Sequence, residues 1–179
     1  MRVGMIGSAI SITALAACAM TGPMNEGQPP VERSASAVVR DTSGAEVAQA
    51  MATQAGDGIR VRIDVSRMAP GTYGAHLHTT GRCDPPDFAS AGPHWNPTGQ
   101  QHGKNNPAGM HKGDLPNLLV GSDGRGSLEI EISAVSLAQG PMPLLDADGA
   151  AIVIHKSADD YRTDPSGNSG ARIACGVFG

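Results

Sequence analysis

The chain has 179 residues, of which 40% are hydrophobic and only 3% aromatic, and its 24 glycines and 13 prolines favour turns and long loops over long helices. Its length fits one domain together with whatever the two ends add. A formal net charge of −4, with no concentration of basic residues, argues against a nucleic-acid-binding protein.

The beginning of the chain has the features of an export signal. Residues 1–17 combine an early arginine, an apolar run and small residues, and they are too short and too weakly flanked for a good membrane span. With the next residue they form LAAC at positions 15–18, which resembles the lipobox of bacterial lipoproteins. The resemblance implies cleavage before Cys18 and lipidation of its thiol. The alternative is cleavage by an ordinary signal peptidase, with Cys18 lost or left as a free thiol.

Three regions are predicted from this reading. Residues 1–17 are the signal peptide, residues 18–34 are the lipidated cysteine and a flexible tether rich in Gly and Pro, and residues 35–179 are the folded domain. We expect the protein to be exported and held at the periplasmic face of a bacterial membrane as a lipoprotein. The alternative location is soluble in the periplasm.

Short segments of alternating apolar and polar residues follow the tether. In chain order they are residues 36–41, 46–53, 58–66, 72–78, 126–133, 150–156 and 171–178. Asp-Gly pairs precede several of them and are typical of turns between strands. Helical periodicity is almost absent, although residues 133–139 could form a turn or two of helix. The pattern predicts an all-β sandwich or barrel.

Two stretches without strand pattern, residues 79–117 and 157–170, are long enough to be functional loops. Five of the six histidines lie between positions 76 and 111. His76 and His78 share one face of a predicted strand and can bind one ion, and His155 at the end of another strand can join them. The long loop supplies a second group of candidate ligands: His94, His102, His111 and Asp114.

The seven candidate ligands point to two metal ions. Imidazole suits both copper and zinc, and three imidazoles with one carboxylate make a plausible tetrahedral zinc site. Two four-coordinate ions need eight ligands, so one histidine would have to use both ring nitrogens and serve both ions.

Three cysteines in an exported chain leave one unpaired. If Cys18 is the lipid anchor, Cys83 and Cys175 remain as a pair in an oxidising compartment. The alternative is that Cys83 and Cys175 are two buried free thiols.

The motifs GAHLH, AGPHWNP, QQHG, HKGDLPN, IVIH and GNSGARIACG, in this order over roughly residues 35–179, resemble the copper–zinc superoxide dismutases, in particular their exported bacterial branch. The resemblance implies an eight-stranded Greek-key β-barrel. It also implies one copper and one zinc ion per subunit, and the disproportionation of superoxide to dioxygen and hydrogen peroxide by a copper ion that changes oxidation state.

Carried over motif by motif, the resemblance assigns individual roles. The copper ligands would be His76, His78, His94 and His155, and the zinc ligands would be His94, His102, His111 and Asp114. His94 would bridge the two metals and take part in catalysis. Arg172 would guide the substrate, Cys83 and Cys175 would form the family's intrasubunit disulfide, and Asp159 would link a copper-ligand histidine to a zinc-ligand histidine.

Each of the non-histidine roles has a simpler alternative. Asp114 could be a turn residue, Asp159 a solvated loop charge, and Arg172 an ordinary surface arginine. Residues 157–170 are short and lack an obvious array of charges, which departs from the family pattern and leaves substrate steering open.

The alternative function is a non-catalytic copper- and zinc-binding relative, such as a metal store or chaperone. Such a relative would be expected to lack a copper ligand or the arginine, and all of them are present here. A generic β-sandwich adhesin would leave the histidines unexplained. The expected partners are superoxide and, through a lipid on Cys18 only, a membrane; the sequence does not decide between a monomer and a homodimer.

Overall fold

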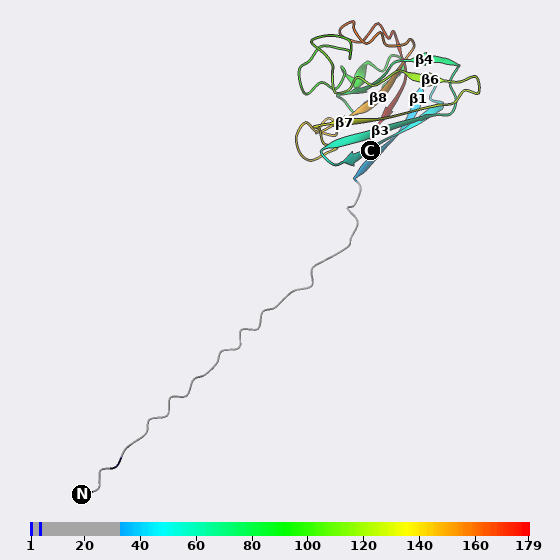
Figure 1. Ribbon diagram of the computed structural model, residues 1–179. Helices are drawn as coiled ribbons and strands as arrows, with labels where there is room; N and C mark the ends of the chain where they lie inside the picture. Colours follow the sequence, from blue (N-terminus) through cyan, green and yellow to red (C-terminus); the bar gives the residue numbers. More distant parts are fainter. Residues whose placement is uncertain (2–3, 5–32) are drawn as a thin grey trace. The chain divides into compact units, whose positions relative to one another are not determined.

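The computed structural model describes residues 1, 4 and 33–179 (Figure 1). Cys18, all but two residues of the predicted signal peptide and nearly all of the predicted tether lie outside the described residues. The chain divides into two units, Met1–Val31 and Glu32–Gly179, and the second carries every strand described below. In the described part of the chain, no helix is long and apolar enough to cross a membrane.

The described residues form nine strands and one short 3-10 helix. They are β1 (Ser34–Asp41), β2 (Glu46–Ala55), β3 (Gly58–Val65), β4 (Gly71–Tyr73), β5 (Ala75–His78), η1 (Ala89–Ala91), β6 (Leu118–Val120), β7 (Gly126–Ser133), β8 (Ala151–His155) and β9 (Arg172–Val177). The seven predicted strands all correspond to strands of the structure, whereas β6 was not predicted because three residues are too few to show an alternating pattern.

The strands curl into a Greek-key β-barrel (Figure 1). Seven of them form an antiparallel sheet in the order β5-β8-β9-β1-β2-β3-β7, and β4 pairs with β6. β4 and β5 are two parts of one extended stretch interrupted at Gly74, and β6 packs beside β7. Counting β4 and β5 together gives eight strands, and the order around the wall departs from chain order as a Greek key requires. The predicted fold class is confirmed.

Strand alternation places the apolar core inside the wall. In β3, Ile59, Val61 and Ile63 are fully buried, while Arg60 and Arg62 between them are exposed. The same period of two holds along most of the barrel, so one face of each strand packs inward. The fold therefore follows mainly from the alternating pattern.

The helical turn expected at residues 133–139 is wrong. The backbone of Ala134 has φ 57, which interrupts a right-handed helix. The Ser136 hydroxyl donates a hydrogen bond to the Pro141 carbonyl at 3.0 Å, and the Leu137 N–H donates to the Gln54 side chain at 2.8 Å. One bond within the turn and one to a side chain far away in the sequence thus satisfy these polar groups without a helix.

Two connections matter for the site. The long loop (residues 79–117) joins β5 to β6, and the short loop (residues 156–171) joins β8 to β9. Cys83 in the long loop is disulfide-bonded to Cys175 in β9, with a Cα–Cα distance of 5.7 Å. The predicted disulfide is confirmed, and it fastens the long loop to the outside of the barrel wall.

Candidate metal centre

All six histidines gather between the barrel wall and the two loops. The centroids of neighbouring imidazole rings lie between 4.0 and 6.1 Å apart. No histidine exposes more than 7% of its surface. Burying so many imidazoles is unfavourable unless their nitrogens have partners, so the contacts of each ring nitrogen decide what the cluster can do.

β5 and the long loop place four of the candidate ligands. His76 and His78 are two residues apart on β5 and therefore point to the same side of the strand. The long loop runs beside β5, and isolated backbone bridges pair His78 with His94 and His76 with Asp114. His94 and Asp114 of the long loop thus lie directly beside the two histidines of β5.

Gly113 makes this close pairing possible. The Leu77 N–H donates to the Gly113 carbonyl at 2.9 Å, and the Trp95 N–H donates to the Leu77 carbonyl at 2.8 Å. A Cβ atom on Gly113 would lie 2.4 Å from the Leu77 carbonyl oxygen. Only glycine can therefore occupy this position without displacing the loop from β5.

Backbone carbonyls fix the orientation of two imidazoles. Nδ1 of His78 lies 2.8 Å from the Gly92 carbonyl, and Nδ1 of His155 lies 3.1 Å from the Gly170 carbonyl. Because a carbonyl only accepts hydrogen bonds, Nδ1 must carry the hydrogen in both rings. Nε2 of each ring then presents a lone pair toward the interior of the cluster.

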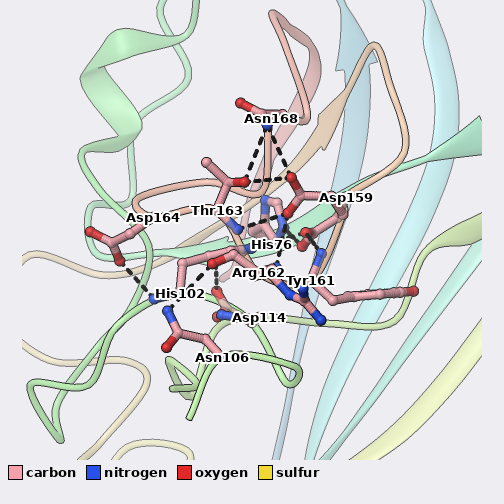
Figure 2. A network of polar contacts seen from close by, with 12 residues as sticks. His76, His102, Asn106, Asp114, Asp159, Tyr161, Arg162, Thr163, Asp164 and Asn168 are labelled. Carbon is pink, nitrogen blue, oxygen red and sulfur yellow. Dashed lines mark hydrogen bonds and ion pairs between the residues drawn. The ribbon is translucent and has the colours of Figure 1, made fainter. Parts of the chain in front are cut away.

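Asp159 does the same for two further imidazoles (Figure 2). Its Oδ2 accepts from Nε2 of His76 at 2.8 Å and its Oδ1 accepts from Nε2 of His102 at 2.9 Å. Burial raises the pKa of Asp159, but the hydrogen bonds from His102 and His76 outweigh it and the pKa is lowered, so the carboxylate is ionised at neutral pH. Nδ1 of His76 is left as a lone pair, and Nδ1 of His102 is the nitrogen that a cation could bind in place of a proton, which is the arrangement of a carboxylate that orients metal-binding histidines.

Four buried ring nitrogens on one side of the cluster have no hydrogen-bond partner among the described residues. The candidate ligand atoms of these four residues lie within 4.8 Å of one another. They are Nδ1 of His76 and Nε2 of His78, His94 and His155. Unsatisfied buried groups are costly, and a bound cation would satisfy all four.

Burial keeps these imidazoles neutral. It lowers the pKa of His76 to about 3, that of His78 to about 2 and that of His155 to about 4. Burial also lowers the pKa of His94, against the opposite effect of Asp114. At neutral pH the four nitrogens are therefore free of protons and available as ligands. All-imidazole donor sets suit copper.

A second set of ligand atoms surrounds one oxygen of Asp114. Nδ1 of His94 lies 2.9 Å from Asp114 Oδ1, and Nδ1 of His102 and of His111 each lie 3.0 Å from it. Nδ1 of His111 is 3.4 Å from Nδ1 of His94. Ligands about 2.0 to 2.1 Å from a tetrahedral zinc ion lie about 3.3 Å from one another, so these separations suit zinc.

His76 also lies close to this second set, because ligand atoms of His76, His94, His102 and Asp114 fall within 4.8 Å of one another. His111 is nevertheless the better fourth ligand. Its Nδ1 contacts Asp114 directly, whereas Nε2 of His76 is bound to Asp159 and its Nδ1 belongs to the first set.

His102 and Asp114 carry opposite charges in the metal-free protein. Burial lowers the pKa of His102, but the hydrogen bonds of Asp114 and Asp159 outweigh it and raise the pKa to about 9. Burial raises the pKa of Asp114, while the hydrogen bonds from His102, His111 and His94 outweigh it and lower the pKa far below its usual range. A proton thus occupies the place where a cation would stabilise the same atoms.

His94 belongs to both sets. Its Nδ1 lies beside Asp114, while its Nε2 is unpartnered and faces the first set. An imidazole that presents one nitrogen to each set could serve as the shared ligand that two four-coordinate ions and seven residues would require.

Arg172 lies at the side of the first set. Its guanidinium donates to the Phe88 carbonyl and to the Gly92 carbonyl, each at 2.8 Å. Its charge contributes to lowering the pKa of His78 and of His155, and burial lowers the pKa of Arg172 itself. Arg172 is therefore a half-buried cation beside the strand histidines, bound to the same carbonyl as His78.

Several residues that support the site were not predicted from the sequence. The carbonyls of Gly92 and Gly170 carry no side-chain signal at all. Asn117 exchanges two hydrogen bonds with the backbone of Asp159, at 2.8 and 2.9 Å. Asp164 accepts the backbone N–H of His102 at 2.7 Å. The aspartate was visible as a loop charge, but nothing in its spacing indicated that it reaches the other loop.

Comparisons with known proteins agree with this geometry. A family model described as copper/zinc superoxide dismutase matches residues 45–178. A "superoxide dismutase-like protein" of Bacillus subtilis is 48% identical over 124 residues, covering 68% of this chain and 63% of that protein. The chain therefore spans less than two thirds of that relative's length.

Two further matches cover a larger share of the matched protein's length. A protein of Caulobacter vibrioides named superoxide dismutase [Cu-Zn] is 42% identical over 148 residues, which is 81% of this chain and 85% of the relative. A solved structure of a superoxide dismutase-like protein from Bacillus subtilis has a TM-score of 0.74 at 41% identity, covering 79% of this chain and 96% of that chain.

Proposed function

The chain belongs to the copper/zinc superoxide dismutase family, and from that premise we propose that it converts superoxide to dioxygen and hydrogen peroxide at a paired copper and zinc site. The observation that carries the proposal is the set of four buried, unpartnered ring nitrogens beside an arginine, because a non-catalytic relative has no need of both.

The residues divide into two ligand sets in this proposal. Copper would be held by His76, His78, His94 and His155, and zinc by His94, His102, His111 and Asp114. A histidine-bound copper ion supplies one-electron redox chemistry, and zinc, which is redox-inert, supplies charge and structure. The donor atoms fit because the first set offers four neutral imidazoles and the second offers three with one carboxylate.

His94 is the residue best placed to handle a proton. Its Nδ1 is engaged beside Asp114 and its Nε2 has no hydrogen-bond partner. When Nε2 of His94 is not bound to a metal, it could hold a proton needed to make hydrogen peroxide and pass it to the substrate side, while Nδ1 stays beside Asp114.

Arg172 is the residue best placed to attract superoxide. The protein carries a formal net charge of −4, which would repel an anion, so a local cation is required. The guanidinium is held by two carbonyls and its charge is felt at His78 and His155. It would orient the anion beside these ligands.

A second candidate function is a copper- and zinc-binding protein without catalysis. The name of the Bacillus subtilis relative, superoxide dismutase-like, favours keeping it. The two candidates share their ligands and differ only in whether the loaded protein turns over substrate.

The experiment loads the purified full chain with copper and zinc, quantifies both metals, and follows superoxide decay. We expect accelerated decay by the loaded protein, and loss of both copper and acceleration in His155→Ala with zinc retained. A wild-type protein that holds both metals without accelerating the decay would establish the non-catalytic alternative.

Export and lipidation at Cys18 remain part of the proposal. The support is the LAAC sequence after an apolar run, and the presence of the disulfide, which persists in oxidising compartments. Labelling cells with radioactive palmitate should mark the wild type and leave Cys18→Ser unmarked; an unmarked, soluble wild type would favour ordinary cleavage.

A further inference from the structure

His102 is held at two ends by carboxylates of the short loop (Figure 2). The Asp159 carboxylate accepts Nε2–H at the tip of the ring, at 2.9 Å. The Asp164 carboxylate accepts the main-chain N–H of the same residue at 2.7 Å. The ring and the backbone of one candidate zinc ligand are therefore both fixed by a loop that holds none of the other zinc-set residues.

We propose that Asp164 is a positioning residue for the zinc site, acting through the backbone of His102. The proposal rests on the proposed function in that it takes Nδ1 of His102 as a zinc ligand. A ring held only at Nε2 can still swing about that point, so its Nδ1 has no fixed direction. Fixing the backbone as well removes this freedom and aims Nδ1 at Asp114, 3.0 Å away.

The backbone N–H of the next residue, Gly103, also donates to a carboxylate, in this case one of the long loop. The Gly103 N–H donates to Oδ2 of Asp114 at 2.9 Å. Gly103 has φ 95, and a Cβ atom there would lie 2.2 Å from the carbonyl carbon of Tyr161. Two consecutive amides thus donate to carboxylates from the two different loops, and the backbone between them cannot move without breaking one of these bonds.

Further hydrogen bonds connect the long loop to the short loop. The Asn105 N–H donates to the Tyr161 carbonyl at 2.9 Å, and the Asn106 side chain donates to the Arg162 carbonyl at 3.3 Å. These bonds use backbone acceptors and would survive a change at Asp164. These bonds therefore keep the two loops together, while the bond from Asp164 acts directly on the backbone of His102.

Asp160 shows that this role is specific to Asp164. The Asp160 carboxylate accepts from Arg162, Thr163 and Asn168, all within the short loop. Asp164 instead reaches across 62 residues of sequence to the long loop. Both aspartates are exposed but have different partners, so of these two only Asp164 contacts a residue of the zinc set.

The test uses the full chain with Asp164→Ala, Asp164→Asn and the control Asp123→Ala. Asn keeps an oxygen acceptor without the charge, and Asp123 accepts a single backbone N–H in a distant turn, from Arg125 at 3.1 Å. Zinc affinity is measured by competition with a chelator, copper content by metal analysis, and exposure of the His102 amide by hydrogen–deuterium exchange before and after zinc loading.

We expect Asp164→Ala to weaken zinc binding about tenfold or more, the usual effect of removing a residue behind a metal ligand. Copper content should stay unchanged, the His102 amide should exchange faster, and Asp164→Asn should recover most of both losses. Equal zinc affinity in Asp164→Ala and Asp123→Ala would overturn the proposal, and so would equal loss of zinc in the Ala and Asn variants, or parallel loss of copper and zinc.

The two proposals fail in different ways. A wild type that binds zinc but does not consume superoxide removes the proposed activity and leaves the role of Asp164 intact. A His102 amide that exchanges at the wild-type rate in Asp164→Ala removes the positioning role without touching the proposed activity.

Discussion

The outer faces of two parts of the barrel wall differ sharply although the same alternation builds both. On β3 and β7, the outward side chains are charged and lie in water: Arg62 contacts Asp64 at 2.7 Å and Glu129 at 3.3 Å, and all three are about half exposed. On β5 and β8, the outward side chains include His76 and His155, which are no more than 3% exposed.

The difference lies in what covers the wall. Strand alternation decides only which residues face outward, and the loops then decide whether outward means water or a closed site. Exposed ion pairs contribute little to stability because water screens them, whereas buried polar groups must all find partners. The covered face is therefore the region where single changes should have large effects.

Removing the carboxylate of Asp159 should have the largest effect on metal binding and stability. Asp159→Ala leaves Nε2–H of His76 and of His102 without acceptors and frees both rings to turn. We expect binding of both metals to weaken about 10- to 100-fold and the fold to lose about 1 to 3 kcal/mol for each orphaned donor. Metal competition assays and denaturant unfolding would measure the two effects.

The matched control is Asp160→Ala, which removes the neighbouring carboxylate. Its bonds stay within the short loop, so metal affinity should remain close to that of the wild type. If both variants lose metal equally, the covered face is sensitive to loop order in general and Asp159 has no special place.

Acid should destabilise the covered face of the metal-free protein. The folded-state pKa values of His76, His78 and His155, about 3, 2 and 4, lie below the ordinary value of 6.5. Between about pH 6.5 and pH 4 the unfolded chain binds protons that the folded protein does not, so stability falls as pH falls. His102, with its pKa raised to about 9, opposes this only weakly below pH 6.5, because it is protonated in both states there.

We expect the metal-free protein to lose about 5 kcal/mol between pH 7 and pH 5, about 2 kcal/mol for each of the three imidazoles less a small offset from His102, measured by denaturant unfolding at each pH. His78→Asn should reduce the slope by about one proton. A stability that is flat across this range, or that rises in acid, would mean that the buried imidazoles take up protons without unfolding.

Arg172 should affect rate and leave binding alone. Arg172→Ala removes the cation beside His78 and His155, and we expect superoxide turnover to fall about tenfold or more and to lose its dependence on ionic strength. Copper and zinc contents should not change. Arg162→Ala, an exposed cation of the short loop, serves as the control; equal rates in the two variants would remove the guiding role.

The open part of the wall should respond least. Arg62→Ala removes contacts to Asp64 and Glu129 that are shared with water, so the unfolding midpoint should move less than in any variant above. A large shift measured by thermal unfolding would show that the charged face also carries the fold, and the comparison would lose its basis.

Sequence reasoning reached the candidate ligands because their side chains carry the signal. His76 and His78 alternate on a strand, and the histidines and Asp114 of the long loop have spacings that the family motifs share. The strands were visible for the same reason, since their apolar residues repeat every two positions. Gly74, which splits one predicted strand into β4 and β5, gave no such sign, because a break between two pairing partners depends on where β6 and β8 lie.

What the sequence could not supply are contacts made by backbone atoms. The carbonyls of Gly92 and Gly170 orient His78 and His155, and the amide of His102 meets Asp164, yet neither kind of contact depends on which side chain the backbone atom carries. Which backbone atoms make these contacts depends on how the long and the short loop pack against the barrel. That packing involves residues from the whole domain.

The carbonyl oxygen of Gly92 couples the motions of His78 and Arg172. It accepts from Nδ1 of His78 and from the guanidinium of Arg172, each at 2.8 Å. The His78 ring and the Arg172 guanidinium are both hydrogen-bonded to this one oxygen atom. A thermal displacement of the backbone at Gly92 therefore moves both groups in the same direction and preserves the distance between them. The atom serves as a common pivot, so the spacing between the charge and the imidazole is steadier than the position of either one.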